Sequence, residues 1–303
     1  MAISTEITPY FRIEAWAFDR YLAHFRNMPL DKASAAGGDW LANIGPMTGA
    51  HKTALRNLRM AFPSENEAWR KDVARAAWAE IGRTAAELPH LPNLDPFGER
   101  IEWVGLERLD AIRDANKGVV FISGHFSNWE LMPMSIARRG APCAMTYRPA
   151  NNPIIDQRIL DIRQAYGAQL QAAKGVEGGM GLMRSLARKV SVALMNDQKY
   201  NEGVAAPLFG YDCMTADGPA RLAHRFKTTL QPMSVRRLNG ARFRITVHEP
   251  VALNHDAPLE TEIPAAVHRV NAFVESVVRA APEQWFWVHK RWPVEAWKAA
   301  GVL

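Results

Sequence analysis

The order of apolar and polar residues divides the chain into two regions. Residues Met1 to about Glu99 have a mostly helical pattern, and Ser64 followed by Glu67 is a capping-box signature before the segment that begins at Ala68. From Ile101 onward, short apolar runs alternate with helical segments, which predicts an α/β fold with a central sheet of mixed direction flanked by helices. The predicted strands are 101–104, 118–123, 144–147, 190–195, 229–235 and 241–247, and the predicted helices are 106–116, 128–139, 154–166, 180–189, 218–226 and 264–280.

We therefore expect a helical N-terminal region over residues 1–99 and an α/β core over residues 100–303, within one continuous domain. A chain of 303 residues is long enough to bury a large core. No stretch has the apolar length that a membrane span requires. The segment from Tyr10 to Arg26 interleaves aromatic residues with arginine and histidine. It predicts either a helix packed on the domain or a helix that lies in a membrane interface.

The most informative motif follows the apolar run from Gly118 to Ser123, which is typical of a buried strand. It reads Gly124-His125-Phe126-Ser127-Asn128-Trp129-Glu130. Ser127 and Glu130 have capping-box spacing, so a helix is predicted to start there. His125 is therefore expected where a buried strand ends and a helix begins, which is the edge at which open α/β sheets bind their ligands.

This placement suits a general base. The positive end of a helix dipole disfavours imidazolium, so His125 is expected to be neutral near pH 7 and able to accept a proton. Glu130 can then accept the other ring N–H and stabilise the cation that forms during the reaction. The alternative is that Glu130 only caps its own helix and that His125 is only a polar strand end.

Other candidate residues follow strands or lie on a predicted helix. Arg148 comes directly after a strand and can bind a phosphate or carboxylate, or it is a solvated loop residue. Arg163 lies on a helix, either near the reacting centre or at the surface. Asp197 and Gln198 follow the strand 190–195, so two strand ends point to one crevice. Asp197 is expected to orient an arginine or a substrate hydroxyl, the alternative being a turn residue.

Charge and composition narrow the function without fixing it. The net charge is +6, with 37 basic and 31 acidic residues, which fits an anionic partner such as a nucleic acid, an anionic lipid or an acidic carrier protein. The charge is spread rather than clustered with aromatic residues, so no nucleic-acid partner is expected. The two cysteines and the remaining histidines lack metal-ligand spacing, and no GxSxG or HExxH motif is present. No metal is expected.

An ordered set of short motifs resembles one enzyme family. The His125–Glu130 spacing is similar to the HxxxxD/E motif of glycerolipid acyltransferases, and the set as a whole resembles the late acyltransferases of lipid A biosynthesis, the lauroyl and myristoyl transferases. The resemblance extends from roughly Leu55 to Trp292. The motifs are Leu55-Arg56-Asn57-Leu58, Ala61-Phe62-Pro63, Tyr147-Arg148-Pro149, Asn152-Pro153, Asp197-Gln198, Pro207-Leu208-Phe209-Gly210, Gly218-Pro219-Ala220 and Gln284-Trp285-Phe286-Trp287.

The resemblance implies transfer of a fatty acyl chain from an acyl-carrier-protein thioester to a hydroxyl of a lipid A precursor, with no other cofactor. His125 and Glu130 would form a catalytic dyad assisted by Arg163. Arg148, Asn128, Asp197 and Gln198 would bind substrate. The implied partners are acyl carrier protein, a membrane glycolipid and the membrane surface, at the cytoplasmic face of the bacterial inner membrane. Another glycolipid or aminolipid acceptor, or a non-catalytic protein that binds anionic lipid or nucleic acid, remains an alternative.

Overall fold

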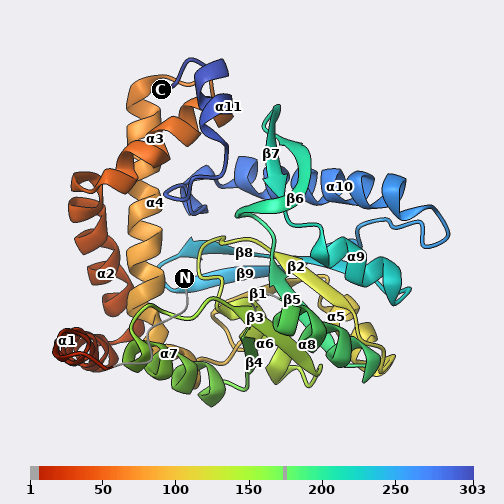
Figure 1. Ribbon diagram of the computed structural model, residues 1–303. Helices are drawn as coiled ribbons and strands as arrows, with labels where there is room; N and C mark the ends of the chain where they lie inside the picture. The colour runs from red at the N-terminus through yellow and green to blue at the C-terminus, as the bar shows by residue number, and fades with distance from the viewer. Residues whose placement is uncertain (1–6, 173–175) are drawn as a thin grey trace.

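A computed structural model describes residues 7–172 and 176–303 (Figure 1). Its centre is a seven-stranded mixed sheet in the order β1-β9-β8-β2-β5-β3-β4. Five neighbouring strands, β8 to β4 in that order, run parallel, whereas β9 is antiparallel to β8 and β1 is parallel to β9. The predicted fold class is confirmed. The strands are β1 Ile101–Val104, β2 Val120–Ser123, β3 Cys143–Tyr147, β4 Gln169–Ala172, β5 Ser191–Met195, β8 Leu230–Asn239 and β9 Arg242–Val247.

Helices precede the sheet in the chain and gather at one end of it, at the left of Figure 1. They are α1 Pro9–Arg26, α2 Leu30–Ile44, η1 Gly45–Met47, α3 Gly49–Ala61, α4 Glu67–Glu87 and η2 Leu88–Asn93. Helices α2 and α4 touch closely because glycines face each other: a Cβ on Gly37 would lie 2.6 Å from the carbonyl oxygen of Gly82. Asn66, not Ser64, caps α4, because its side chain accepts the N–H of Trp69. The capping-box prediction there was wrong. None of the described helices is both long and apolar enough to cross a membrane.

The central strands are buried on both faces, as is typical of parallel sheets. Phe121 of β2 packs with Leu109 of α5 (Leu106–Asp114) and with the apolar side chains of α6 (Leu131–Arg138). Its neighbours Val120 and Ile122 face α8 (Val176–Ala187), α9 (Gly218–Arg225) and α10 (Leu259–Ala280). The alternation of side chains along β2 thus joins two helical layers around one strand.

The C-terminal segment forms a further apolar cluster. Trp285, Trp287, Trp292 and Trp297 are each less than 5% exposed and pack with residues of α3, α4 and α10. The amide of Asn57 on α3 donates to the backbone oxygens of Trp287 (2.8 Å) and His289 (2.7 Å). These contacts hold the segment against the N-terminal helices.

Some elements differ from those predicted. The sequence pattern missed β4 and the antiparallel hairpin of β6 (Lys199–Leu208) and β7 (Tyr211–Thr215). Helix α8 begins at Val176, four residues before the predicted start, and α10 begins at Leu259, so that Pro264 lies inside it. The remaining helices are α7 (Pro153–Ala165), η3 (Pro282–Gln284) and α11 (Val294–Ala299).

Candidate active site

Two parallel strands deliver the main candidate residues to one edge of the sheet. Strands β2 and β5 are neighbours, with Ser123 opposite Met195, and the N–H of Asn196 donates to the carbonyl of Ser123 at 2.8 Å. The chain leaves β2 toward His125 and leaves β5 toward Asp197. The prediction that these two strand ends point to one crevice is confirmed.

Asp197 holds His125 by two hydrogen bonds. Its Oδ1 lies 2.8 Å from His125 Nδ1, and its Oδ2 accepts the backbone N–H of His125 at 2.8 Å. The indole N–H of Trp285 donates to the same Oδ2 at 2.9 Å. Asp197 is only 2% exposed. It therefore fixes both the backbone and the ring of His125, a role different from the predicted contact to an arginine or substrate hydroxyl.

The charges of this pair are set by burial and by mutual attraction. Burial alone would raise the pKa of Asp197, but the charge and hydrogen bonds of His125 and the indole of Trp285 lower it to about 2. Burial alone would lower the pKa of His125, yet the charge and hydrogen bond of Asp197, with a smaller contribution from Glu130, raise it above its ordinary value. Since Asp197 is ionised, Nδ1 carries a proton, and the neutral ring keeps its lone pair on Nε2.

Glu130 does not accept the ring N–H of His125, so the predicted His125/Glu130 hydrogen-bonded dyad was wrong. Its carboxylate is paired with the guanidinium of Arg163 through Nε (2.9 Å) and Nη2, and it accepts the phenol of Tyr166 at 2.8 Å. Burial would raise the pKa of Glu130, but the charge and hydrogen bonds of Arg163 and the phenol lower it. Glu130 therefore acts as a permanently charged anchor beside the histidine.

The local structure of the motif also differs from the prediction. Helix α6 begins at Leu131, and Glu130 makes no side-chain cap. Ser127 has a positive φ of 46°, and its hydroxyl donates to Glu80 at 3.1 Å rather than capping α6. His125 thus lies six residues before the helix, and its pKa is raised, so the helix-dipole argument for a neutral imidazole was wrong. The backbone after β2 turns tightly, because a Cβ on Gly124 would lie 2.5 Å from the ring of Phe126.

A cavity of about 330 Å³ opens beside His125. Five of the candidate residues line it, namely His125, Glu130, Arg163, Arg148 and Gln198. Its apolar wall comes from β3, β5 and α6 and consists of Met132, Pro133, Met145, Ala193, Leu194 and Met195, with Trp129, Thr146, Tyr147 and Tyr166 completing the lining. The cavity therefore places polar and charged groups next to an apolar surface.

Two predicted substrate-binding residues have other positions. Asn128 is 1% exposed, does not line the cavity, and donates to Glu87 at 2.7 Å. It is therefore a buried structural contact that does not reach the cavity. Asp197 likewise does not line the cavity and reaches it only through His125.

The arginines of the cavity are in contrasting states. Arg163 is held by Glu130, and its Cζ lies 6.0 Å from the ring centroid of Tyr147. Arg148 is exposed and has no ion pair or side-chain hydrogen bond within residues 7–172 and 176–303. Arg148 is thus free to bind an anionic group, whereas Nε and Nη2 of Arg163 donate to Glu130.

Sequence reasoning missed three aromatic residues. Tyr166 lies three residues after Arg163 and contacts Glu130 from the same helix end, so its spacing offered a signal. Trp285 was named only within the motif Gln284-Trp285-Phe286-Trp287, and nothing in the local sequence indicates its bond to Asp197. Phe286 follows it and lies with its ring centroid 5.8 Å from that of His125.

Comparisons with known proteins identify the family. The sequence matches the family described as bacterial lipid A biosynthesis acyltransferase over residues 3–293. It is 25% identical to the lipid A biosynthesis myristoyltransferase of Escherichia coli K12 over 82% of this chain and 79% of the relative. It is 25% identical to the lauroyltransferase of the same organism over 79% and 78%, respectively. A phosphatidylinositol mannoside acyltransferase of Mycolicibacterium smegmatis is 24% identical over 63% and 65%. The resemblance found in the sequence is thereby confirmed, and the chain belongs to the bacterial lipid A biosynthesis acyltransferase family.

Proposed function

We propose that this acyltransferase moves a fatty acyl chain from an acyl-carrier-protein thioester to a hydroxyl of a lipid A precursor, with His125 as general base. The observation that carries the proposal is the His125–Asp197 pair at the wall of a cavity that also holds two arginines. A histidine with Nδ1–H bound to a carboxylate has its free Nε2 available to a substrate proton.

The reaction needs only the side chains of the site and the two substrates. His125 Nε2 takes the proton of the acceptor hydroxyl while the hydroxyl oxygen attacks the thioester carbon. The tetrahedral intermediate then collapses, the carbon–sulfur bond breaks, and the proton passes from the imidazolium to the leaving thiolate. Asp197 stabilises the imidazolium between the two steps because it lies 2.8 Å from Nδ1 and stays ionised.

The arginines divide two tasks in this proposal. Arg163, fixed by Glu130, supplies positive charge near the thioester oxygen, where preorganised donors have their largest effect on rate. Arg148, which is exposed and unpaired within the described parts of the chain, binds an anionic group of one of the substrates. The net charge of +6 favours encounter with an acidic carrier protein.

The test is a reaction with the purified protein. Acyl carrier protein loaded with lauroyl or myristoyl chains is incubated with a lipid A precursor, and the products are identified by mass spectrometry. Parallel reactions use an acyl-coenzyme A donor, or a mannosylated phosphatidylinositol or an aminolipid as acceptor. The proposal predicts a product one acyl group heavier than the lipid A precursor, and its loss in His125→Ala. Transfer only to another acceptor would reassign the substrate, and no transfer in any reaction would contradict the proposal.

We also propose that α1 attaches the protein to the cytoplasmic face of the inner membrane. Tyr10, Ile13 and Trp16 are spaced by three residues and are 64%, 67% and 65% exposed. The opposite face of α1, with Leu22 and Phe25, is buried. One face of the helix therefore packs on the domain, and the other is available to a membrane interface. An aromatic and aliphatic stripe flanked by arginines fits a membrane interface rich in anionic lipid.

Flotation with anionic liposomes at low and high salt tests the attachment. We expect binding that weakens at high salt, because screening shortens the reach of charge. Replacing Tyr10, Ile13 and Trp16 with serine should abolish it. A matched control replaces exposed apolar residues elsewhere, namely Val104, Leu259 and Val294. Unchanged binding of the α1 variant would exclude this surface, and no binding of the intact protein would exclude peripheral attachment.

A further inference from the structure

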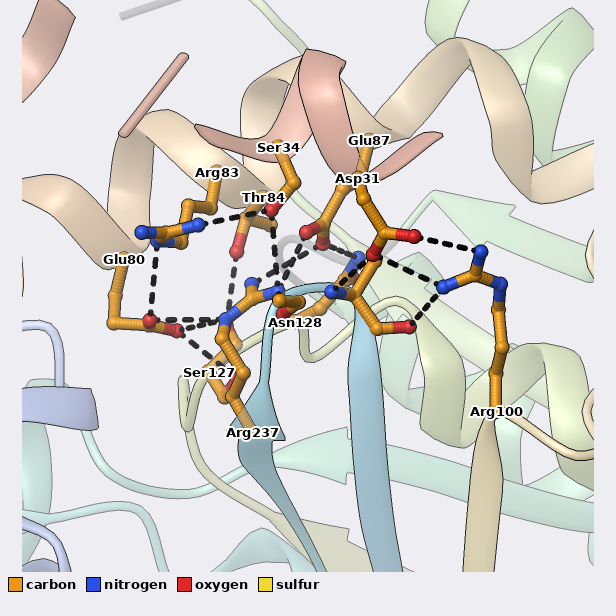
Figure 2. Close-up of polar contacts among 12 residues, drawn as sticks. Asp31, Ser34, Glu80, Arg83, Thr84, Glu87, Arg100, Ser127, Asn128 and Arg237 are labelled. Atoms are coloured by element: carbon orange, nitrogen blue, oxygen red, sulfur yellow. Dashed lines mark hydrogen bonds and ion pairs between the residues drawn. The ribbon is translucent and has the colours of Figure 1, made fainter. Parts of the chain in front are cut away.

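One face of α4 holds the loop that follows His125. Glu80, Thr84 and Glu87 recur at helical spacing and point toward Ser127 and Asn128 (Figure 2). The hydroxyl of Ser127 donates to Glu80 at 3.1 Å, and the hydroxyl of Thr84 donates to the carbonyl of Ser127 at 3.1 Å. Asn128 donates to Glu87 at 2.7 Å. Three side chains of one helix thus fix two consecutive loop residues.

Arg237 of β8 joins the two carboxylates. Its Nε lies 2.9 Å from both oxygens of Glu80, and its Nη1 lies 2.5 Å from Glu87. The side chains of Arg237 and Glu87 are 5% and 2% exposed. Arg83 lies 3.9 Å from Glu80 on its other side, so two arginines balance two carboxylates. Figure 2 shows Arg237 reaching from the sheet into the gap between α4 and the loop.

The backbone of the loop is held from a second direction. Ser127 donates its N–H to the carbonyl of Gln284 at 2.7 Å. The side chain of Gln284 also bonds the backbone N–H (2.7 Å) and carbonyl (3.0 Å) of Arg237. Ser127 has a left-handed φ of 46°, a conformation that costs a non-glycine residue energy and persists where surrounding contacts over-determine it. The contacts from α4, β8 and Gln284 supply that constraint.

Neither carboxylate of this network, nor Arg237, lines the cavity. Glu80 and Glu87 bond the middle of a loop whose ends, His125 and Glu130, both line the cavity, and the side chain of Arg237 reaches the loop through these two carboxylates. A buried polar network of this kind fixes one arrangement through its paired groups. The amide nitrogen of Asn128 is one of them, whereas its Oδ1 has no hydrogen-bond partner among the described residues. The network therefore lies where it can act on the reaction only through the geometry of the loop.

We propose that Glu80, Glu87 and Arg237 are positioning residues that set the placement of His125 by immobilising Ser127 and Asn128. The inference rests on the proposed function, in which His125 is the base. Displacement of a catalytic group by about 1 Å can lower a rate on the order of 10²-fold, so a distant network can control turnover strongly. A network that merely joins the N-terminal helices to the sheet would affect stability alone.

The test compares Glu87→Gln with a matched control, Glu262→Gln. Glu262 is a buried carboxylate of α10, 8% exposed, that is also paired with an arginine, Arg269. Both variants are expected to lower the melting temperature. Below that temperature, only Glu87→Gln should lower kcat, by about tenfold or more, with KM nearly unchanged. Wild-type kcat in Glu87→Gln, or an equal loss in Glu262→Gln, would overturn the proposal.

A milder pair of variants covers the case in which Glu87→Gln does not fold. Thr84→Val removes only the hydroxyl that bonds Ser127, and Thr53→Val is the control at a buried threonine of α3. The titration of His125, followed by NMR with ¹⁵N-labelled histidine, reports on its placement without any turnover. We expect its midpoint to shift toward 6.5 in Thr84→Val and to stay unchanged in Thr53→Val. An unmoved midpoint in Thr84→Val contradicts the positioning role, whereas full activity of His125→Ala would contradict only the proposed function.

Discussion

The two ends of the loop from His125 to Glu130 carry different kinds of charge pair. At one end, the carboxylate of Asp197 faces a histidine, which gains and loses a proton near neutral pH. At the other end, the carboxylate of Glu130 faces Arg163, which stays protonated at every working pH. Both carboxylates are buried, but Glu130 lines the cavity, whereas Asp197 reaches it only through His125.

The two pairs therefore have different roles: the first takes part in proton transfer, and the second holds side chains in place. A carboxylate paired with histidine can stabilise a charge that appears only during the reaction, as acid–base catalysis requires. A carboxylate paired with arginine and a phenol keeps a constant charge, so it fixes positions and field. The HxxxxE motif contains one residue of each pair, His125 and Glu130. These two residues do not bond each other: His125 bonds Asp197, and Glu130 bonds Arg163.

The largest effect is expected from His125→Ala, which removes the imidazole of the His125–Asp197 pair. Turnover should fall by on the order of 10²–10⁴-fold, the usual contribution of a positioned base. The variant removes one of the three donors to Asp197, since the backbone N–H at position 125 and the indole N–H of Trp285 remain. Steady-state acyl transfer, with circular dichroism as a control for folding, measures the result. Near-normal turnover of a folded variant would remove His125 from the mechanism.

Asp197→Asn breaks the same pair from its other side. We expect turnover to fall on the order of 10²-fold, because the amide cannot stabilise the imidazolium and no longer fixes one tautomer. The same assay measures it. If this variant keeps wild-type turnover while Glu130→Gln does not, the roles that we assign to the two carboxylates are reversed.

Glu130→Gln tests the supporting pair. The amide keeps an acceptor for Tyr166 but leaves the guanidinium of Arg163 without a counter-charge, and loss of one partner of a buried pair costs about 3 kcal/mol or more of unfolding free energy. We expect a lower melting temperature and a fall in turnover of about tenfold, through a less ordered Arg163. Thermal denaturation and turnover are measured on the same preparation. An unchanged melting temperature would show that the pair is not an anchor.

Trp285→Phe should have the smallest effect. It removes the indole donor to Asp197 but leaves the two bonds from His125, so we expect turnover to fall by less than about tenfold. A loss as large as that of Asp197→Asn would mean that the indole, and not the histidine, determines the state of the carboxylate.

The sequence predicted the parts of the fold that depend on local periodicity. The first three residues of strand β2, Val120 to Ile122, are apolar because both faces of the strand are buried, and this pattern is visible in the sequence. The hairpin of β6 and β7 was missed because the first four residues of β6, Lys199 to Glu202, are exposed and carry mostly polar side chains. Edge strand β4 is only four residues long, so it offered little pattern.

The candidate site was predicted as a set of residues but not as a set of contacts. His125, Arg148, Arg163 and Gln198 do share one cavity, because they follow strand ends or lie on the helix beside them. The partner of His125 was misassigned because sequence spacing favours Glu130, five residues away, over Asp197, which lies 72 residues along the chain but just past the end of the neighbouring strand β5. Register between parallel strands decides such a pairing, and a single sequence does not contain it.

The central claim is that Asp197, not Glu130, determines the protonation of His125. The most direct measurement is the NMR titration of the ¹⁵N-labelled His125 ring in the intact protein, in Asp197→Asn and in Glu130→Gln, with His125→Ala used to assign the signal. Since Asp197 is the main cause that raises the pKa of His125, we predict a midpoint above 6.5 in the intact protein, a large fall in Asp197→Asn and a smaller fall in Glu130→Gln. A midpoint that stays in place in Asp197→Asn and falls in Glu130→Gln would contradict the account.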